Sequence, residues 1–500
     1  MLKATEKSGS LTAHVSWLMF AKTLAFLFNI ALPVLVVRRL DLVQFGVYKQ
    51  LFLMVATSVA VLQLGFGMSA YYFLPREPER QPEVIFNIFA FNTAIGGLAC
   101  ACLVLWPSVL GLVFHQAGLT GYAWLMGLVI LLWTVSSPLE IIPIANGEMK
   151  LASAMIMSVQ LTRTAMYVAS VIVFGTVRAL MYAAVVQGVL QAGVLWWYLQ
   201  SRFGGFWRRF DYGLLRHQLS YAVPLGLAGV LYTVQTDLHS YFVSNRLGAA
   251  AFAIYAVGTI QLPLTTLLQE ATNAVLIPRV SYLQHINDTR EIVLLIARAT
   301  RKLAAVYFPI FAMLFATAHE LIAFAFTRRY LASVPVFLIN LTLLLVSILL
   351  QDPLFRAYKD QRFFLIRLRV FTCALLVAGL WFGTTRFGPV GAITAVVIVS
   401  VTERTITAIR FGRILGVGWS DIVLLKDVGK LAVAAAAAGI AAAAVRLPLL
   451  GAKPLVILIV CGVVFSLVYL GAVLLLGVLT AEETEMVRRK ARVVIPSLSR

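Results

Sequence analysis

The sequence predicts an all-α, polytopic membrane protein with about 14 transmembrane helices, since one helix-plus-loop unit takes about 30 to 35 residues. Hydrophobic residues make up 61% of the 500 residues and charged residues only 12%, about half the charged share of a typical soluble domain. No long polar stretch remains for a soluble domain. The apolar stretches lie at about 14–37, 45–73, 83–106, 119–139, 151–175, 179–200, 218–243, 251–277, 301–326, 332–351, 363–383, 388–411, 428–446 and 454–479.

The charge distribution predicts the orientation of these helices. The chain has 41 Lys and Arg residues against 21 Asp and Glu, a net charge of +20. If both termini are cytoplasmic, the loop Lys and Arg residues favour the cytoplasmic side by about three to one, as the positive-inside rule requires. We therefore expect a multi-pass protein of the cell inner (cytoplasmic) membrane, with basic loops that contact anionic membrane lipids and no nucleic acid. The polar residues 1–10 are interpreted as a cytoplasmic tail, not a signal peptide.

An internal repeat predicts how the helices are grouped. After the same interval of 207 residues, Arg39-Leu40, Phe45 and Tyr48 recur as Arg246-Leu247, Phe252 and Tyr255. Six spans separate the copies, which favours two six-helix lobes related by a parallel pseudo-repeat. The expected organisation is an N-terminal lobe at 1–200, a cytoplasmic linker at 201–217, a C-terminal lobe at 218–411, two further helices at 428–479 and a basic cytoplasmic tail at 480–500.

Two cations fall inside predicted spans. Lys22 lies about eight residues into the first span, and Arg163 lies centrally in the fifth, with Gln160 one turn away on the same face. Arginine at the bilayer centre costs at least about 2.5 kcal/mol, so such residues normally face a cavity or a partner. We expect Lys22 and Arg163 to line a cavity that accepts an anionic group. The alternative is an internal salt bridge with one of the acids inside the spans.

Acidic residues inside the spans are fewer. Asp237 lies in the seventh span close to His239, and Glu270 lies in the eighth. An acid at this depth can bind a proton or Na⁺ and so couple transport to an ion gradient. An equally good interpretation is a structural gate in which Asp237 pairs with Arg246 or Lys22.

Several chemistries find no support in the sequence. There is no Walker motif, no HExxH and no metal-ligand cluster, and the four cysteines lie inside apolar segments. We therefore expect no cofactor, no metal site and no enzymatic activity. A membrane-bound polymerase or glycosyl transferase would need a larger outer loop than this chain offers.

Two short patterns resemble a known family. Arg38-Arg39-Leu40-Asp41 with Phe45-Gly46 and Tyr48, joined to Asp237, Arg246-Leu247-Gly248 and Tyr255, is similar to the polysaccharide-transport (Wzx-type) branch of the multidrug/oligosaccharidyl-lipid/polysaccharide (MOP) exporter superfamily. The resemblance implies alternating access and a cationic cavity between the lobes, for which Lys22, Arg163, Arg38, Arg39 and Arg246 are the candidates. Asp237, His239 and Glu270 would serve ion coupling or gating.

The resemblance also implies a substrate. Such relatives flip undecaprenyl-pyrophosphate-linked oligosaccharides to the periplasmic leaflet for O-antigen and lipopolysaccharide synthesis, driven by an ion gradient, the membrane potential or both. The basic loops could then contact the polysaccharide polymerase machinery. The alternatives are a lipid II flippase of the same superfamily and a cation-coupled multidrug antiporter, which would need acids to dominate the cavity.

Overall fold

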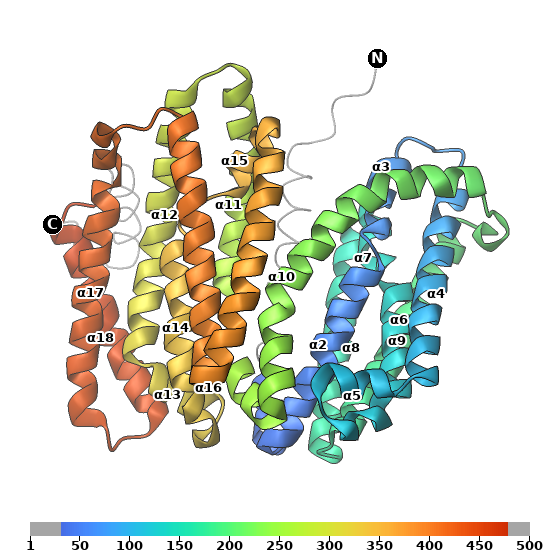
Figure 1. Cartoon of the computed structure of the whole chain (residues 1–500), viewed down its shortest axis with the longest axis horizontal. Helices are drawn as coiled ribbons and strands as arrows, with labels where there is room; N and C mark the ends of the chain where they lie inside the picture. Colours follow the sequence, from blue (N-terminus) through green and yellow to red (C-terminus); the bar gives the residue numbers. More distant parts are fainter. Residues whose placement is uncertain (1–31, 479–500) are drawn as a thin grey trace, which may run out of the picture. The chain divides into compact units, whose positions relative to one another are not determined.

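The computed structural model describes residues 32–478, and every regular element in that range is helical (Figure 1). Ten stretches within it are long and apolar enough to cross a membrane, which confirms the all-α membrane fold. One of these stretches, Phe363–Ile414, contains two spans, and the first predicted span lies mostly outside the described residues. The predicted seventh span lies within one helix, whereas the predicted eighth span, 251–277, is interrupted at 259–262, and neither is among the ten.

The chain divides into two compact units, with a boundary between Ala256 and Val257. Unit 1 therefore comprises the described residues 32–256 and unit 2 the residues 257–478, and each is described by itself. The division follows internal packing and falls near the end of one long helix. The lobe, linker and tail boundaries expected from the sequence remain predictions.

Unit 1 consists of long helices joined by short helical turns. Its elements are a helix at 32–39, α2 (Leu42–Leu62), η1 (Phe66–Met68), α3 (Ser69–Phe73), α4 (Gln81–Leu105), α5 (Ser108–Phe114), η2 (Ala117–Tyr122), α6 (Ala123–Ser136), α7 (Pro138–Ala145), α8 (Met149–Val173), α9 (Val177–Arg202), η3 (Phe206–Arg208) and most of α10 (Tyr212–Gly258).

Helix α2 has a defined start. The Asp41 carboxylate accepts a hydrogen bond from the Gln44 backbone N–H at 2.8 Å, and the Gln44 side chain caps the Asp41 N–H in return. This capping box satisfies donors that the first helical turn leaves unpaired. Near the start of α2, a side chain at Gly46 would overlap the backbone carbonyl of Ala249. Glycine is therefore required where α2 crosses α10.

Helix α10 is interrupted at Gly248, whose φ of 78° lies in the region that favours glycine. Residues 212–247 and 249–258 are therefore two helical segments with a break at one residue. The first segment packs on the turn that directly follows α2, since a side chain at Gly226 would overlap the carbonyl of Leu64. This close packing explains why residues 212–256 belong to unit 1.

From α12 to η6, unit 2 largely repeats the order that unit 1 shows from α4 to η3. It consists of α11 (Pro263–His285), α12 (Thr289–Ala316), α13 (Ala318–Ala325), η4 (Arg328–Ser333), α14 (Val334–Val346), α15 (Asp352–Ala357), η5 (Lys359–Gln361), α16 (Arg362–Ile414), η6 (Trp419–Leu425), α17 (Lys426–Arg446), η7 (Leu447–Leu449) and α18 (Pro454–Leu475).

Helix α16 is a hairpin of two spans. Gly388 has a φ of 58° and is not helical, and the two segments meet there without a loop. Gly383 and Gly391 pack backbone to backbone, because a side chain at either would overlap the other's carbonyl group. The segment 362–387 of α16 corresponds to α8, and the segment 389–414 corresponds to α9.

An ion pair recurs at the same place in the two units. Arg80, just before α4, pairs with Asp211, just before α10, and Arg290 at the start of α12 pairs with Asp421 in η6. Both pairs span 131 residues, and the second follows the first by 210 residues. We call these two ion pairs the clasps. The backbone N–H of Leu214, together with Arg80, holds the pKa of Asp211 below its ordinary value.

Candidate functional site

Arg163 lies inside unit 1 against aromatic rings and an amide. Its guanidinium carbon is 5.9 Å from the Trp133 ring centroid, and its Nη2 donates a hydrogen bond to Gln160 Oε1 at 2.9 Å. Phe52 of α2 completes the group. Its ring centroid lies 6.2 Å from that of Trp133 and 5.7 Å from that of Tyr167. Aromatic faces attract a cation through the negative charge of their π-systems. The group therefore holds a positive charge in place within the helical bundle.

The sequence predicted part of this group. Arg163 and Gln160 are three residues apart on α8, a spacing that always brings helical side chains together. Tyr48 was predicted only as part of the repeat, and Phe52, one turn further along α2 with its ring centroid 4.9 Å from that of Tyr48, was not predicted to belong to this group. Their helical spacing is the signal in the sequence, but the partners across the bundle are not encoded locally.

Asp237 lies on α10 where this helix packs against α2. Its Oδ2 accepts a hydrogen bond from Thr57 Oγ1 at 2.6 Å. Two turns earlier on the same face of α2, Gln50 Nε2 donates to Ser244 Oγ at 2.9 Å. Two polar bridges therefore join α2 to the first segment of α10.

His239 does not share the surroundings of Asp237. Its Nδ1 lies 2.8 Å from the Tyr255 hydroxyl and 3.3 Å from Ser240 Oγ. Residues two apart on a helix point in different directions, so the sequence neighbours separate. The structure thus places Asp237 against α2 and His239 against the second segment of α10.

Arg246 lines a cleft at the break in α10. The cleft has a volume of about 870 Å³. Asn245 shapes one side of it by donating to the Val113 carbonyl at 2.8 Å and contacting His115 Nδ1 at 2.6 Å. The other lining residues are Val43, Phe114, Gln116, Leu247, Gly248, Ala249 and Ala250. Arg246 and Arg163 therefore occupy different surroundings within unit 1.

The remaining predicted residues are scattered. Arg38 and Arg39 are exposed on the helix at 32–39, and Glu270 is exposed on α11 of unit 2. Lys22 lies outside the described residues, so its expected pairing or cavity position stays a prediction. Lys49 lies within α2, with its Nζ 5.7 Å from the Phe45 ring centroid.

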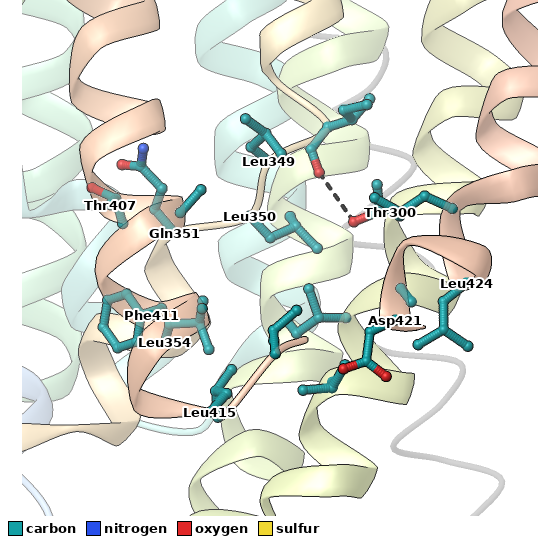
Figure 2. A pocket seen from close by; sticks show the side chains of 18 of the residues that line it. Thr300, Leu349, Leu350, Gln351, Leu354, Thr407, Phe411, Leu415, Asp421 and Leu424 are labelled. Atoms are coloured by element: carbon teal, nitrogen blue, oxygen red, sulfur yellow. Dashed lines mark hydrogen bonds between the residues drawn. The ribbon is translucent and has the colours of Figure 1, made fainter. Parts of the chain in front are cut away.

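Unit 2 contains a cavity that the sequence did not indicate. It has a volume of about 280 Å³ and lies between α12, the α14–α15 connection, the end of α16 and η6 (Figure 2). Most of its walls are apolar. Within the described part of the chain, Gln351 Nε2 and Thr407 Oγ1 are buried there without a hydrogen-bond partner. Arg404 also borders it and donates to the Leu349 carbonyl at 2.8 Å.

A family model described as polysaccharide biosynthesis protein matches residues 34–335. No curated protein matches the sequence at a significant level. The matched range covers the whole of unit 1 except its first described residues, and it continues into α14 of unit 2. It thus includes the surroundings of Arg163, Asp237 and Arg246.

Solved structures share this fold at low sequence identity. A lipid II flippase, MurJ, in an inward closed conformation is 14% identical, with a TM-score of 0.63 over 89% of this chain and 98% of that chain. An inward-facing multidrug resistance MATE family transporter of the MOP superfamily is 16% identical, with a TM-score of 0.60 over 80% of this chain and 96% of that one. A MOP superfamily transporter from Pyrococcus furiosus, described by a binding pocket of reverse polarity, is 14% identical, with a TM-score of 0.56 over 80% and 93%.

Proposed function

Because this chain belongs to the polysaccharide biosynthesis protein family of the MOP superfamily, we propose that it flips an undecaprenyl-pyrophosphate-linked oligosaccharide from the cytoplasmic to the periplasmic leaflet. The transporter would work by alternating access in the cell inner membrane, with both termini in the cytoplasm. O-antigen and lipopolysaccharide synthesis would be the pathways it serves.

The observation that carries this proposal is the position of Arg163. A guanidinium within a membrane span is costly unless it meets a partner or a charged ligand. Here Gln160 and the Trp133 ring hold it from within unit 1. An anionic head group such as pyrophosphate can accept two parallel hydrogen bonds from a guanidinium, so Arg163 is the residue we propose for binding it.

The membrane potential would favour the proposed direction. Two negative charges that move outward across an inside-negative membrane gain about 4 to 5 kcal/mol per 100 mV. We therefore predict that collapsing the potential with a K⁺ ionophore, while the pH gradient is kept, slows flipping in reconstituted vesicles. Unchanged flipping under that condition would leave an ion gradient as the energy source. Asp237, hydrogen-bonded to Thr57, is the residue we propose for binding the coupling ion.

A complementation assay tests the proposal. Arg163→Gln should lower surface polysaccharide by about tenfold or more, because a hydrogen bond to a charged group contributes about 1.5–3 kcal/mol. Lipid-linked units should then accumulate on the cytoplasmic leaflet. The matched control is Arg178→Gln, since Arg178 also lies over an aromatic ring, 6.0 Å from the Tyr122 centroid, but at the exposed start of α9. Normal polymer from Arg163→Gln at matched protein level would contradict the proposed role.

A lipid II flippase is the second candidate, since the MurJ structure is similar over 98% of its own length. Two complementation strains distinguish the two functions, one that lacks its polysaccharide flippase and one that is depleted of its lipid II flippase. Rescue of growth in the second strain, without restoration of surface polysaccharide in the first, would favour lipid II. A multidrug antiporter would instead export dyes in exchange for cations and restore neither phenotype.

A further inference from the structure

The two clasps allow the units to be compared position by position. Arg80 and Asp211 of unit 1 correspond to Arg290 and Asp421 of unit 2, with an interval of 210 residues. Helix α9 has 26 residues, the same length as the segment 389–414 of α16, so positions there correspond with an interval of 212. We can therefore compare the side chains that pack against η3 in unit 1 with those near η6 in unit 2.

In unit 1 this space is filled by aromatic side chains. Phe206 of η3 is fully buried, and its ring centroid lies 5.3 Å from that of Trp196 on α9. Trp207 stacks on Trp196 with ring centroids 5.8 Å apart, and Phe89 of α4 adds a fourth ring, 5.7 Å from that of Trp196. Four rings therefore close the end of unit 1.

Two buried amides fill the adjoining space in unit 1. Asn87 Nδ2 donates to Gln218 Oε1 at 3.0 Å, and it also donates to the Asp211 carbonyl at 3.0 Å. Gln218 in turn donates to the Val84 carbonyl at 3.2 Å. Both amide side chains are fully buried.

In unit 2 the corresponding side chains are small or apolar. Ala408 corresponds to Trp196, Ala297 to Asn87 and Val428 to Gln218, and all three line the cavity of Figure 2. In addition, Trp419 of η6 is 90% exposed and does not fill the space. The cavity of about 280 Å³ thus lies where unit 1 places its indole and amide side chains.

The place and lining of the cavity indicate what occupies it. Its α12 wall runs from Val293 to Thr300, about 6 to 17 Å from the start of that helix at 1.5 Å per residue. This stretch directly precedes the predicted span 301–326, so the cavity lies toward the membrane surface of one leaflet, which is about 20 Å thick with its head groups. The walls are mainly apolar, and Ala408 is exposed, so the cavity is open to its surroundings.

Two further features narrow the ligand class. Besides Arg290, which pairs with Asp421 in the clasp, the elements around the cavity carry three exposed cations at the same end, Arg410, Arg413 and Lys426. Clustered cations at a membrane surface attract anionic head groups. Gln351 Nε2 and Thr407 Oγ1 also lack an acceptor among the described residues. The ester carbonyl of a phospholipid is such an acceptor, whereas an isoprenoid chain has none.

From these features we infer that the unit 2 cavity binds one acyl chain of an anionic phospholipid from the adjacent leaflet. The chain occupies the space that Trp196 and Asn87 fill in unit 1. Its ester carbonyl accepts hydrogen bonds from Gln351 and Thr407. This lipid is separate from the substrate of the proposed transport reaction, and the site stands whether or not that proposal holds.

Photolabelling tests the site directly. The full chain is placed in nanodiscs that contain phosphatidylglycerol with a diazirine on one acyl chain, irradiated, and analysed by peptide mass spectrometry. We expect label on 293–300 and 404–415. Ala408→Trp, which imitates unit 1, should reduce that label to the level of other lipid-facing peptides. Ile409→Trp is the matched control, because Ile409 is adjacent, 53% exposed and outside the cavity lining.

Further arms test the head group and the chain. Removing one rim cation with Lys426→Gln should weaken labelling about fivefold, since a cation near an anionic surface contributes about 1 kcal/mol. A phosphatidylcholine probe should label weakly, and a diazirine polyprenyl phosphate should not compete. Equal labelling of Ala408→Trp and Ile409→Trp would overturn the site, provided that both variants are monodisperse. Stronger labelling by the polyprenyl probe would overturn the assignment to a phospholipid.

Discussion

Units 1 and 2 largely share the order of their helices but stabilise the ends of those helices differently. At one end, unit 1 buries Phe206 against the half-exposed Trp196, where unit 2 has a cavity bordered by Ala408. At the other end, the buried Leu110 of α5 corresponds to Glu320 of α13, which is equally buried and bonded to Arg446 at 2.8 Å. The clasps are thus shared, whereas the packing near the helix ends has diverged.

The largest expected effect on the unfolding free energy comes from removing the Phe206 ring, which fills the end of unit 1. Phe206→Ala removes a fully buried ring, and such a change costs about 3–5 kcal/mol of unfolding free energy through lost burial and the cavity that remains. Ala408→Trp in unit 2 should change the unfolding free energy by less than about 1.5 kcal/mol, since the indole enters an existing cavity. Unfolding in mixed micelles, followed by circular dichroism, measures both. Trp419→Ala is the control, because this side chain is 90% exposed.

An intermediate effect is expected at the opposite end of unit 2. Arg446→Met leaves the buried Glu320 carboxylate without its cation, which we expect to cost about 2–3 kcal/mol, less than for a fully buried pair because Arg446 is 28% exposed. The double variant Glu320→Leu with Arg446→Met imitates the Leu110 environment and should recover most of the loss. The same assay measures the unfolding free energies of both variants. A double variant no more stable than Arg446→Met would contradict the correspondence between Leu110 and Glu320.

The smallest effect is expected at the unit 1 clasp, where the side chains of Arg80 and Asp211 are both partly exposed to solvent. Because the folded-state pKa of Asp211 lies below its ordinary value, its contribution to stability is present at neutral pH and is lost as the pH falls below about 4. Arg80→Gln should reduce this acid sensitivity only in part, since the Leu214 N–H still bonds the Asp211 carboxylate. The acid sensitivity is measured as the loss of amide hydrogen-exchange protection at the start of α10 between pH 7 and pH 3. Arg76→Gln is the control, and equal acid sensitivity in both variants would show that the unit 1 clasp does not contribute.

Local patterns in the sequence predicted more than distant contacts did. Hydropathy identified the spans of α4, α8 and α9, and the three-residue spacing of Gln160 and Arg163 placed them together. The contact between Thr57 and Asp237 joins residues 180 apart, and no local pattern encodes it. The cavity in unit 2 escaped prediction for the same reason, because small residues such as Ala408 signal an opening only once their neighbours across the bundle are known.

The single-residue turn in α16 constrains how this part of the chain enters the membrane. Two apolar segments, 362–387 and 389–414, are joined at Gly388, without a long polar loop that would stay on one side of the membrane. Gly383 and Gly391 lie in backbone contact, so the two segments are already paired close to the turn. Insertion of one segment alone would leave that small-residue face against lipid and the other segment in water. The pair is therefore suited to leave the insertion machinery as one helical hairpin, after both segments have been synthesised.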